Sequence, residues 1–323
     1  MILKLLTHIS RVLVSILFIY SGFVKLVDPI GSQFKFEEYF SESVLNIEFL
    51  IPFALPFSIL LIVAELALGV MLLVGYKPKF TVWSLFGLNL IFLFLTWYSY
   101  TYNKVTDCGC FGDAIKLTPK ETFYKNIIFM VFIIILIIGL KYIKSIISTK
   151  FAAIASFASI IVSLLIVYHV LNHLPIIDFR AYSVGTDIAD GMEYKGDGEI
   201  PPIHDFMIET DDGDQLEPML AKEKALLVIM YNFEKTEKEG IASIAQVAKD
   251  AKNKGYEIYV LTASYIEDLQ ATQKEFDLPY SFGFCDETAL KTAIRANPGV
   301  ITVENGIIVG KWNWTDADDV VLK

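Results

Sequence analysis

The chain has 323 residues, of which 54% are hydrophobic, and its mean hydropathy is +0.51, which is too apolar for an ordinary soluble protein of this length. Its charge is divided unevenly. Residues 1–175 carry 13 basic and 9 acidic side chains, whereas residues 176–323 carry 14 and 28. This division predicts a membrane domain followed by an acidic, water-soluble domain, and the acidic surface argues against nucleic acid or anionic lipid as a partner of that second domain.

Five apolar stretches are long enough to cross a bilayer, which requires about 20 residues. They are residues 9–27, 53–76, 80–100, 123–140 and 151–171. The first is predicted to be a membrane helix and not a signal peptide, because its apolar run is long and no small-residue cleavage site follows it. The first half of the chain is therefore expected to be an all-α bundle of five transmembrane helices in contact with the lipid bilayer.

Basic residues predict the orientation of this bundle. The loops expected on one side carry lysine or arginine and no acid: Lys4, Arg11, Lys77, Lys79, Lys141, Lys144 and Lys150. Because such residues collect on the cytoplasmic side, the amino terminus is expected in the cytoplasm and the acidic domain outside. The loop at residues 101–122 is expected on that outer side.

Two of the three cysteines lie in this loop, as Cys108-Gly109-Cys110. The glycine lets the backbone bend between the sulfurs, so the pair can close into a strained disulfide that is easily reduced. We interpret Cys108 and Cys110 as a redox-active pair. The alternatives are a permanent disulfide, inert thiols, or metal ligation, for which two cysteines without a nearby histidine are a poor set.

Ionisable side chains inside the bilayer are the second signal. Glu65 lies near the middle of the second predicted helix, where a carboxylate needs a partner or a polar cavity. Asn89 lies at a similar depth on the third helix, and Lys25, near the outer end of the first, can extend its side chain toward Glu65. We favour a structural polar contact between helices, with Glu65 neutral or bonded to Asn89; the alternatives are proton transfer or a cavity for a polar ligand head group.

Three motifs resemble the DoxX-like and MauE-like membrane family over about residues 5–145: Ser21-Gly22-Phe23-Val24-Lys25-Leu26, Glu65-Leu66-Ala67-Leu68-Gly69, and Asp107-Cys108-Gly109-Cys110-Phe111-Gly112. The resemblance implies a multi-pass protein of a bacterial inner membrane, with the outer domain in the periplasm. It also implies thiol chemistry that helps a periplasmic or membrane protein partner to form disulfides. A membrane quinone is the cofactor that the resemblance suggests.

The second half alternates strand and helix signals. We expect a membrane domain at residues 1–175, a linker rich in Gly, Asp and Pro at 176–202, and an α/β domain at 203–323. Strands at 225–231 and 257–262, helices at 236–254, 265–276 and 286–295, and a hairpin turned at Glu304-Asn305-Gly306 follow the order of a thioredoxin-like fold. Pro298 matches the cis-proline of that family. The usual Cys-x-x-Cys is missing, because Asn232 to Lys238 follow the first central strand.

The remaining candidates are weak. Cys285 has aromatic and acidic neighbours, which favour a buried, inert thiol, with a role as a third relay sulfur as the alternative. The four histidines, His8, His169, His173 and His204, have no metal-binding spacing, so no metal site is expected. Three functions stay open: a membrane thiol-disulfide oxidoreductase, a membrane-anchored scaffold with a structural disulfide, and, with less support, a small-molecule or proton-coupled transporter.

Overall fold

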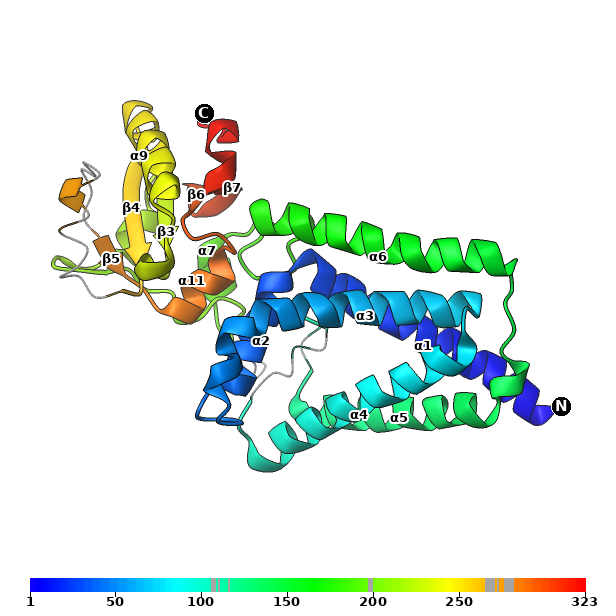
Figure 1. Ribbon diagram of the computed structural model, residues 1–323. Coiled ribbons are helices and arrows are strands. Elements are labelled where there is room, and N and C mark those ends of the chain that lie inside the picture. Colours follow the sequence, from blue (N-terminus) through cyan, green and yellow to red (C-terminus); the bar gives the residue numbers. More distant parts are fainter. Residues whose placement is uncertain are drawn as a thin grey trace. The chain divides into compact units, whose positions relative to one another are not determined.

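The computed structural model describes residues 1–105, 109, 111–115, 117–196, 200–264, 271, 273–275 and 282–323. It contains two compact units, Met1–Leu171 and Asn172–Lys323 (Figure 1). The first consists of helices and the second is built on a mixed sheet, so the expected order of an α-helical part and an α/β part is observed. Each unit is described by itself below.

Five helices of the first unit are long and apolar enough to cross a membrane: α1 (Ile2–Val27), α3 (Ala54–Val74), α4 (Pro78–Tyr102), α5 (Pro119–Ile138) and α6 (Thr149–Asn172). They confirm the five predicted spans. Their ends follow ordinary capping chemistry; α5, for example, begins four residues earlier than predicted because Thr118 and Glu121 form a reciprocal capping box. A short 3-10 helix, η2 (Leu140–Tyr142), follows α5.

The sequence did not predict helix α2 (Pro29–Phe40), which lies between α1 and α3 together with the 3-10 helix η1 (Glu48–Phe53). Interactions between neighbouring residues determine where α2 begins. The Asp28 side chain accepts a hydrogen bond from the Gly31 amide at 2.9 Å, and Pro29 occupies the first helical position, where its missing N–H costs nothing. The helix packs on α3 and thereby covers one end of the bundle.

Helices α1 and α3 make the closest contact in the first unit. A side chain on Gly22 would place its Cβ 2.7 Å from Leu66 Cγ, and one on Gly69 would lie 2.8 Å from Ile19 Cγ1 and 3.1 Å from the Ile19 backbone nitrogen. Both distances are shorter than a real contact, so the approach of the two helices requires glycine at both positions.

The other end of this helix pair is held by Arg11 of α1. Its guanidinium donates hydrogen bonds of 2.8, 2.9 and 2.9 Å to the backbone carbonyls of Leu72, Leu73 and Lys144. The last carbonyls of a helix have no partner within the helix, and Arg11 supplies one for the end of α3. Gly75 then ends α3 in the left-handed conformation, with φ +76°.

The second unit is built on a seven-stranded mixed sheet in the order β2-β1-β5-β4-β3-β6-β7. The strands are β1 (Glu209–Thr210), β2 (Gly213–Asp214), β3 (Lys224–Met230), β4 (Glu257–Thr262), β5 (Phe282–Phe284), β6 (Gly299–Glu304) and β7 (Ile307–Asn313). Strands β3, β4 and β5 are parallel, whereas β6 and β7 run antiparallel to their neighbours. The predicted strands at 225–231 and 257–262 and the hairpin turned at 304–306 therefore lie at the centre and at one edge of this sheet.

Both faces of the sheet are covered. Alternate residues of β3 point to opposite faces: Leu226 and Val228 pack against α9 (Lys238–Asn253), and Leu227 and Ile229 pack against α11 (Glu287–Ala293). Short helices complete the unit: α7 (Ile188–Met192), α8 (Leu216–Leu220), η3 (Phe233–Lys235) and η4 (Trp314–Asp319). The expected helix at 265–276 lies largely outside the described residues.

The boundaries differ from the expected ones. The segment at 176–202, expected to be a linker, contributes Tyr182 and Ile188 to the core beside α11. Asp187 begins α7 by accepting hydrogen bonds from the amides of Ala189 and Asp190. Glycine and aspartate in this segment form caps and turns within the second unit, a use that composition does not distinguish from a linker.

The close contact of α1 and α3 predicts a difference between two glycines. Valine in place of Gly69 should lower the free energy of unfolding by about 1–3 kcal/mol, because it overpacks the contact. Gly87→Val is the matched control, since a Cβ at Gly87 meets no atom within 4 Å. Thermal unfolding in detergent measures both, and an equal loss in the two variants would contradict the packing argument.

Candidate functional site

Cys108 and Cys110 lie outside the described residues, but Gly109 and Phe111 beside them are described. Gly109 has φ +64°, a left-handed conformation that favours glycine. A Cβ at Gly109 would lie 2.8 Å from Cγ of Lys35. Glycine at the centre of the cysteine pair is thus required by both its backbone conformation and the neighbouring lysine stem.

Two lysines border the described part of this loop. The alkyl stem of Lys35, from α2, approaches Gly109, and its ammonium is 2.9 Å from Glu38. Lys125, from α5, places its ammonium 4.2 Å from the centre of the Phe111 ring, which is a cation–π contact. Lys35 and Lys125 are site residues that the sequence did not single out, because they are 75 and 15 residues from Cys110 and only the fold brings them to the loop.

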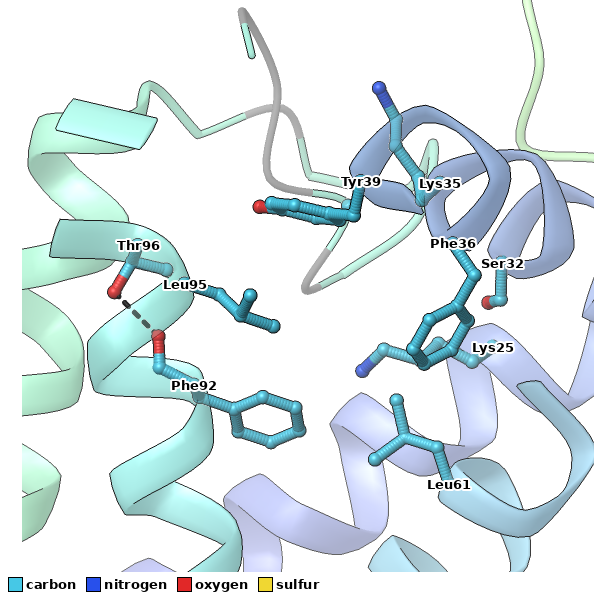
Figure 2. Close-up of a pocket in the computed structure, with 10 residues that line it drawn as sticks. Lys25, Ser32, Lys35, Phe36, Tyr39, Leu61, Phe92, Leu95 and Thr96 are labelled. Atoms are coloured by element: carbon cyan, nitrogen blue, oxygen red, sulfur yellow. Dashed lines mark hydrogen bonds between the residues drawn. The ribbon is translucent and has the colours of Figure 1, made fainter. Parts of the chain in front are cut away.

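A cavity of about 60 Å³ lies next to Gly109. Aromatic and aliphatic side chains form most of its wall, and Figure 2 shows the Lys25 ammonium pointing into the space between Phe36, Leu61 and Phe92. The remaining lining residues are Ser32, Lys35, Tyr39, Leu95 and Thr96. The cavity thus combines apolar walls with one buried cation, the composition of a site for a small apolar ligand with a polar group.

Lys25 and Glu65 form a buried ion pair between α1 and α3. The ammonium donates to the two carboxylate oxygens at 3.1 and 3.0 Å and to the Ser21 hydroxyl at 2.7 Å. Lys25 is 5% exposed and Glu65 is not exposed at all. A charge at this depth requires such a partner, so Glu65 is held as one half of a structural contact between two helices.

Asn89 is not the partner that the structure gives Glu65. Its side-chain amide donates to the backbone carbonyl of Asn126 on α5 at 3.1 Å, and Asn126 in turn donates to the Thr96 hydroxyl at 3.3 Å. The expected contact placed two residues of similar depth together. They belong to different helix pairs, since α4 packs mainly on α5 and α1 packs mainly on α3.

The ion pair predicts strongly unequal mutational effects. Lys25→Met leaves a buried carboxylate without its cation and should lower the free energy of unfolding by about 3–5 kcal/mol. Adding Glu65→Gln removes the unpaired charge and should recover at least half of the loss. Thermal unfolding of both variants in detergent tests this, and a double variant less stable than Lys25→Met would contradict it.

In the second unit, a thioredoxin-like order predicts a functional site just after β3. Hydrogen bonds between the backbone of Asn232 and the side chain of Asn297 occupy this place. After β3, the Asn232 amide donates to the Asn297 side-chain oxygen at 3.3 Å, and the Asn297 side chain donates to the Asn232 carbonyl at 2.6 Å. The Asn297–Pro298 peptide bond is cis. A Cβ on Gly240, in the first turn of α9, would lie 2.9 Å from both Pro298 Cδ and the Trp314 ring. These contacts close the start of α9 against the loop that carries Pro298.

Cys285 is 1% exposed and lies in the core between the sheet and α11. Burial, together with the Asp286 carboxylate, raises the pKa of its thiol to about 12, against backbone hydrogen bonds that lower it. A protonated, covered thiol is a poor nucleophile. These observations favour the inert interpretation of Cys285 over a relay sulfur.

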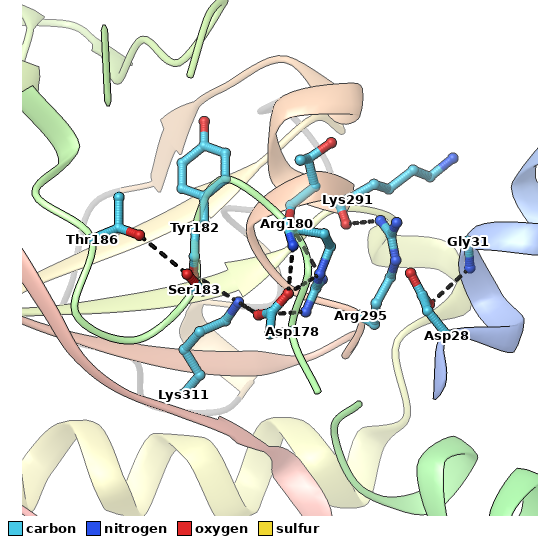
Figure 3. Close-up of polar contacts among 11 residues, drawn as sticks. Asp28, Gly31, Asp178, Arg180, Tyr182, Ser183, Thr186, Lys291, Arg295 and Lys311 are labelled. Carbon is cyan, nitrogen blue, oxygen red and sulfur yellow. Dashed lines mark hydrogen bonds and ion pairs between the residues drawn. The ribbon is translucent and has the colours of Figure 1, made fainter. Parts of the chain in front are cut away.

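A second polar cluster lies beside β7, where Figure 3 shows Lys311, Asp178 and Arg180 pointing toward one another. Lys311 donates to Asp178 at 2.6 Å and to the Tyr182 carbonyl at 2.9 Å, and Arg180 donates to both Asp178 oxygens at 2.6 and 2.9 Å. Two cations thus share one carboxylate. Burial and the nearby Arg180 lower the pKa of Lys311 to about 7, although the Asp178 carboxylate opposes this shift.

This cluster predicts a pH dependence of stability. Between pH 7 and 9, an unfolded Lys311 binds a proton that the folded side chain releases, so the free energy of unfolding should rise with pH, by up to about 1.4 kcal/mol per unit. Above pH 9, Cys285 and Tyr182 should make the free energy of unfolding fall as the pH rises, because their pKa values are higher in the folded protein than in the unfolded chain. Chemical unfolding followed by tryptophan fluorescence should show a smaller slope in Lys311→Met, and an unchanged slope would assign the effect to other groups.

Among the described residues, no group of three or more His, Cys, Asp or Glu side chains could hold a metal ion. The candidate functional features are therefore the cavity beside Gly109 and the cysteine pair that the sequence places on either side of that glycine.

Comparison with known proteins supports the membrane part of this assignment. Residues 3–139 match the family model described as methylamine utilisation protein MauE, in agreement with the resemblance expected for residues 5–145. Protein TlpB of Flavobacterium psychrophilum is 30% identical over 133 residues, which are 38% of this chain and 34% of the relative. The chain therefore spans about a third of the length of that relative. No solved structure was found to match.

Proposed function

We propose that the protein is a membrane thiol-disulfide redox protein in which Cys108 and Cys110 exchange electrons with a protein partner. The observation that carries the proposal is the cysteine pair itself, in a loop between two helices able to span a membrane, α4 and α5. The MauE match over residues 3–139 includes this loop. Multi-pass membrane character is supported by the same match and by the five apolar helices.

The surroundings of the loop support a reactive thiolate. Lysines lower the pKa of a nearby thiol and favour the thiolate form that attacks disulfides. Lys35 contacts Gly109, and Lys125 lies over the Phe111 ring, so two lysines lie next to described residues of this loop. The catalytic roles of Cys108 and Cys110 are part of the proposal.

The proposed reaction is oxidation of a partner dithiol. The Cys108–Cys110 disulfide accepts two electrons and two protons, through a mixed disulfide, and becomes a dithiol, while the partner gains a disulfide. Returning the pair to the disulfide then requires a two-electron acceptor. The sequence holds one further cysteine, Cys285, which is buried, so the acceptor is proposed to be a membrane quinone that leaves as quinol.

The cavity beside Gly109 supports this choice of acceptor. Its walls include aromatic rings and the Lys25 ammonium, which can donate to a quinone carbonyl. Its volume, about 60 Å³, is below the roughly 150 Å³ that holds a benzene ring in a protein interior. Binding of a quinone ring therefore includes movement of lining side chains.

The second unit is proposed to be a thioredoxin-like docking domain without its own redox site. Two observations support this: the central strand order β4-β3-β6-β7, with only the first two parallel, and the position of Pro298 before β6. The contacts between Asn232 and Asn297 occupy the place where a dithiol motif follows the first central strand in that family. Recognition of the partner, rather than electron transfer, is the role that remains for such a domain.

The proposed orientation follows from charge. The lysine-rich turns support a cytoplasmic amino terminus, and the proposed arrangement with five spans has the cysteine loop and the second unit in the periplasm of a bacterial inner membrane. Disulfides persist in that compartment.

A scaffold with a permanent disulfide is the second candidate, favoured by the closed position at Asn232 and Asn297. Transport through a cavity at Glu65 is less favoured, because Lys25 neutralises that carboxylate.

Thiol trapping in intact cells tests the proposed function. A mass-shifting alkylating reagent should find Cys108 and Cys110 partly reduced, and the reduced fraction should rise in cells depleted of quinone. One of the variants Cys108→Ala and Cys110→Ala should accumulate a mixed disulfide with the partner. Cys285→Ala is the control and should change neither result.

Two outcomes would decide against parts of the proposal. A pair that is fully oxidised and unresponsive to reductant would establish the scaffold. A responsive pair that ignores quinone depletion would keep the thiol chemistry and remove the quinone.

A further inference from the structure

An open pocket of about 700 Å³ lies at the start of α4, at the opposite end of that helix from the cysteine loop. Its lining combines two lysines with two aromatic rings and a hydroxyl: Lys77, Pro78, Lys79, Phe80, Trp83 and Ser84. This combination is typical of a membrane–water interface, where aromatic rings lie at the level of the lipid head groups and lysines meet their phosphates. None of these residues takes part in the proposed redox chemistry.

The charge at this pocket is unbalanced. Lys77 and Lys79 are exposed, and no acidic residue occurs in the sequence between Glu65 and Asp107. The ammonium of Lys77 lies 5.5 Å from the centre of the Tyr76 ring, and no ion pair is found for either lysine among the described residues. Two cations at the edge of an apolar bundle attract an anionic group.

A second observation, independent of the lysines, concerns the surface of α4 next to the pocket. One turn beyond Trp83, a Cβ at Gly87 would meet no atom within 4 Å. Trp83 is 50% exposed, and Leu90 and Ile91 beyond Gly87 are also exposed. Since residues three and four apart share a helix face, Phe80, Trp83, Gly87 and Leu90 line one apolar strip with a gap at the glycine. The gap is suited to an acyl chain.

We propose that this pocket binds one anionic phospholipid, with its phosphate at Lys77 and Lys79 and an acyl chain across Gly87. The indole N–H of Trp83 and the hydroxyl of Ser84 are additional donors from the same wall. The proposal commits to an anionic lipid because the lysines carry charge without an acidic neighbour, whereas a zwitterionic lipid brings its own cation. It is independent of the proposed redox function.

Lysines are generally in excess on one side of membrane proteins. The alternative to a specific pocket is therefore that every basic loop on that side attracts anionic lipid equally. Lys141 and Lys144 test this alternative. They lie between α5 and α6, on the side expected for Lys77 and Lys79, and they do not line the pocket. Replacing either pair removes two positive charges, but only one replacement changes the pocket.

Quenching of tryptophan fluorescence by brominated lipids measures the binding. The sequence has four tryptophans, of which Trp83 and Trp97 lie on α4 and Trp312 and Trp314 in the second unit. In a Trp97→Phe background, Trp83 reports on the pocket from within the bilayer. The full-length protein is reconstituted with brominated phosphatidylglycerol or brominated phosphatidylcholine at varied mole fractions.

Phosphatidylglycerol should bind at Trp83 about 25-fold more tightly than phosphatidylcholine, because each of the two lysines contributes about fivefold. The double variant Lys77→Gln/Lys79→Gln should lose this preference, by about fivefold for each lysine, and Lys141→Gln/Lys144→Gln should retain it. Gly87→Leu should weaken quenching by phosphatidylglycerol without lowering the unfolding temperature, because the leucine enters empty space. Equal quenching by the two lipids in the parent, or the same loss in both lysine pairs, would overturn the proposal.

Discussion

The ion pair between Lys25 and Glu65 is the contact on which the membrane unit depends. A carboxylate inside a bilayer needs a partner at hydrogen-bond distance, and that partner can reach it only if α1 and α3 pack closely. Gly22 permits this, because a Cβ there would lie 3.2 Å from Glu65 Cβ. Close packing and charge neutralisation are therefore a single requirement, met by a glycine and a lysine three residues apart on one helix.

The same pair determines what the cavity offers. Because Glu65 holds Lys25, the ammonium stays at the cavity wall and does not move toward the membrane surface, as an unpaired lysine near a helix end would. Arg11 holds the other end of α3 through the backbone carbonyls of Leu72 and Leu73, and it also bonds to the carbonyl of Lys144 beyond η2. Helix α3 is thus fixed to its neighbours at two depths, and the cavity beside Gly109 is built against a rigid pair of helices.

Sequence patterns predicted the features that depend on composition along the chain and missed those that depend on direction around a helix. The five spans follow from hydropathy because a bilayer imposes length and excludes charge. Of the two partners considered for Glu65, the favoured Asn89 was wrong and Lys25 was correct, since depth does not reveal which neighbour a helix faces. Lys35 and Lys125 carried no signal for the same reason. The segment at 176–202 was expected to be a linker because caps and turns use the residues that linkers use.

The number of cysteines limits how the two units can share a redox reaction. A single pair in the membrane unit can be oxidised or reduced once, and the second unit adds one covered thiol with a raised pKa. Electrons that enter the pair from a partner must then leave to a molecule outside the chain. Just after β3 the second unit has Asn232, which is hydrogen-bonded to Asn297, and no cysteine. Under the proposed function, electron transfer and recognition of the partner are therefore assigned to different units, so the second unit needs no cysteine pair of its own.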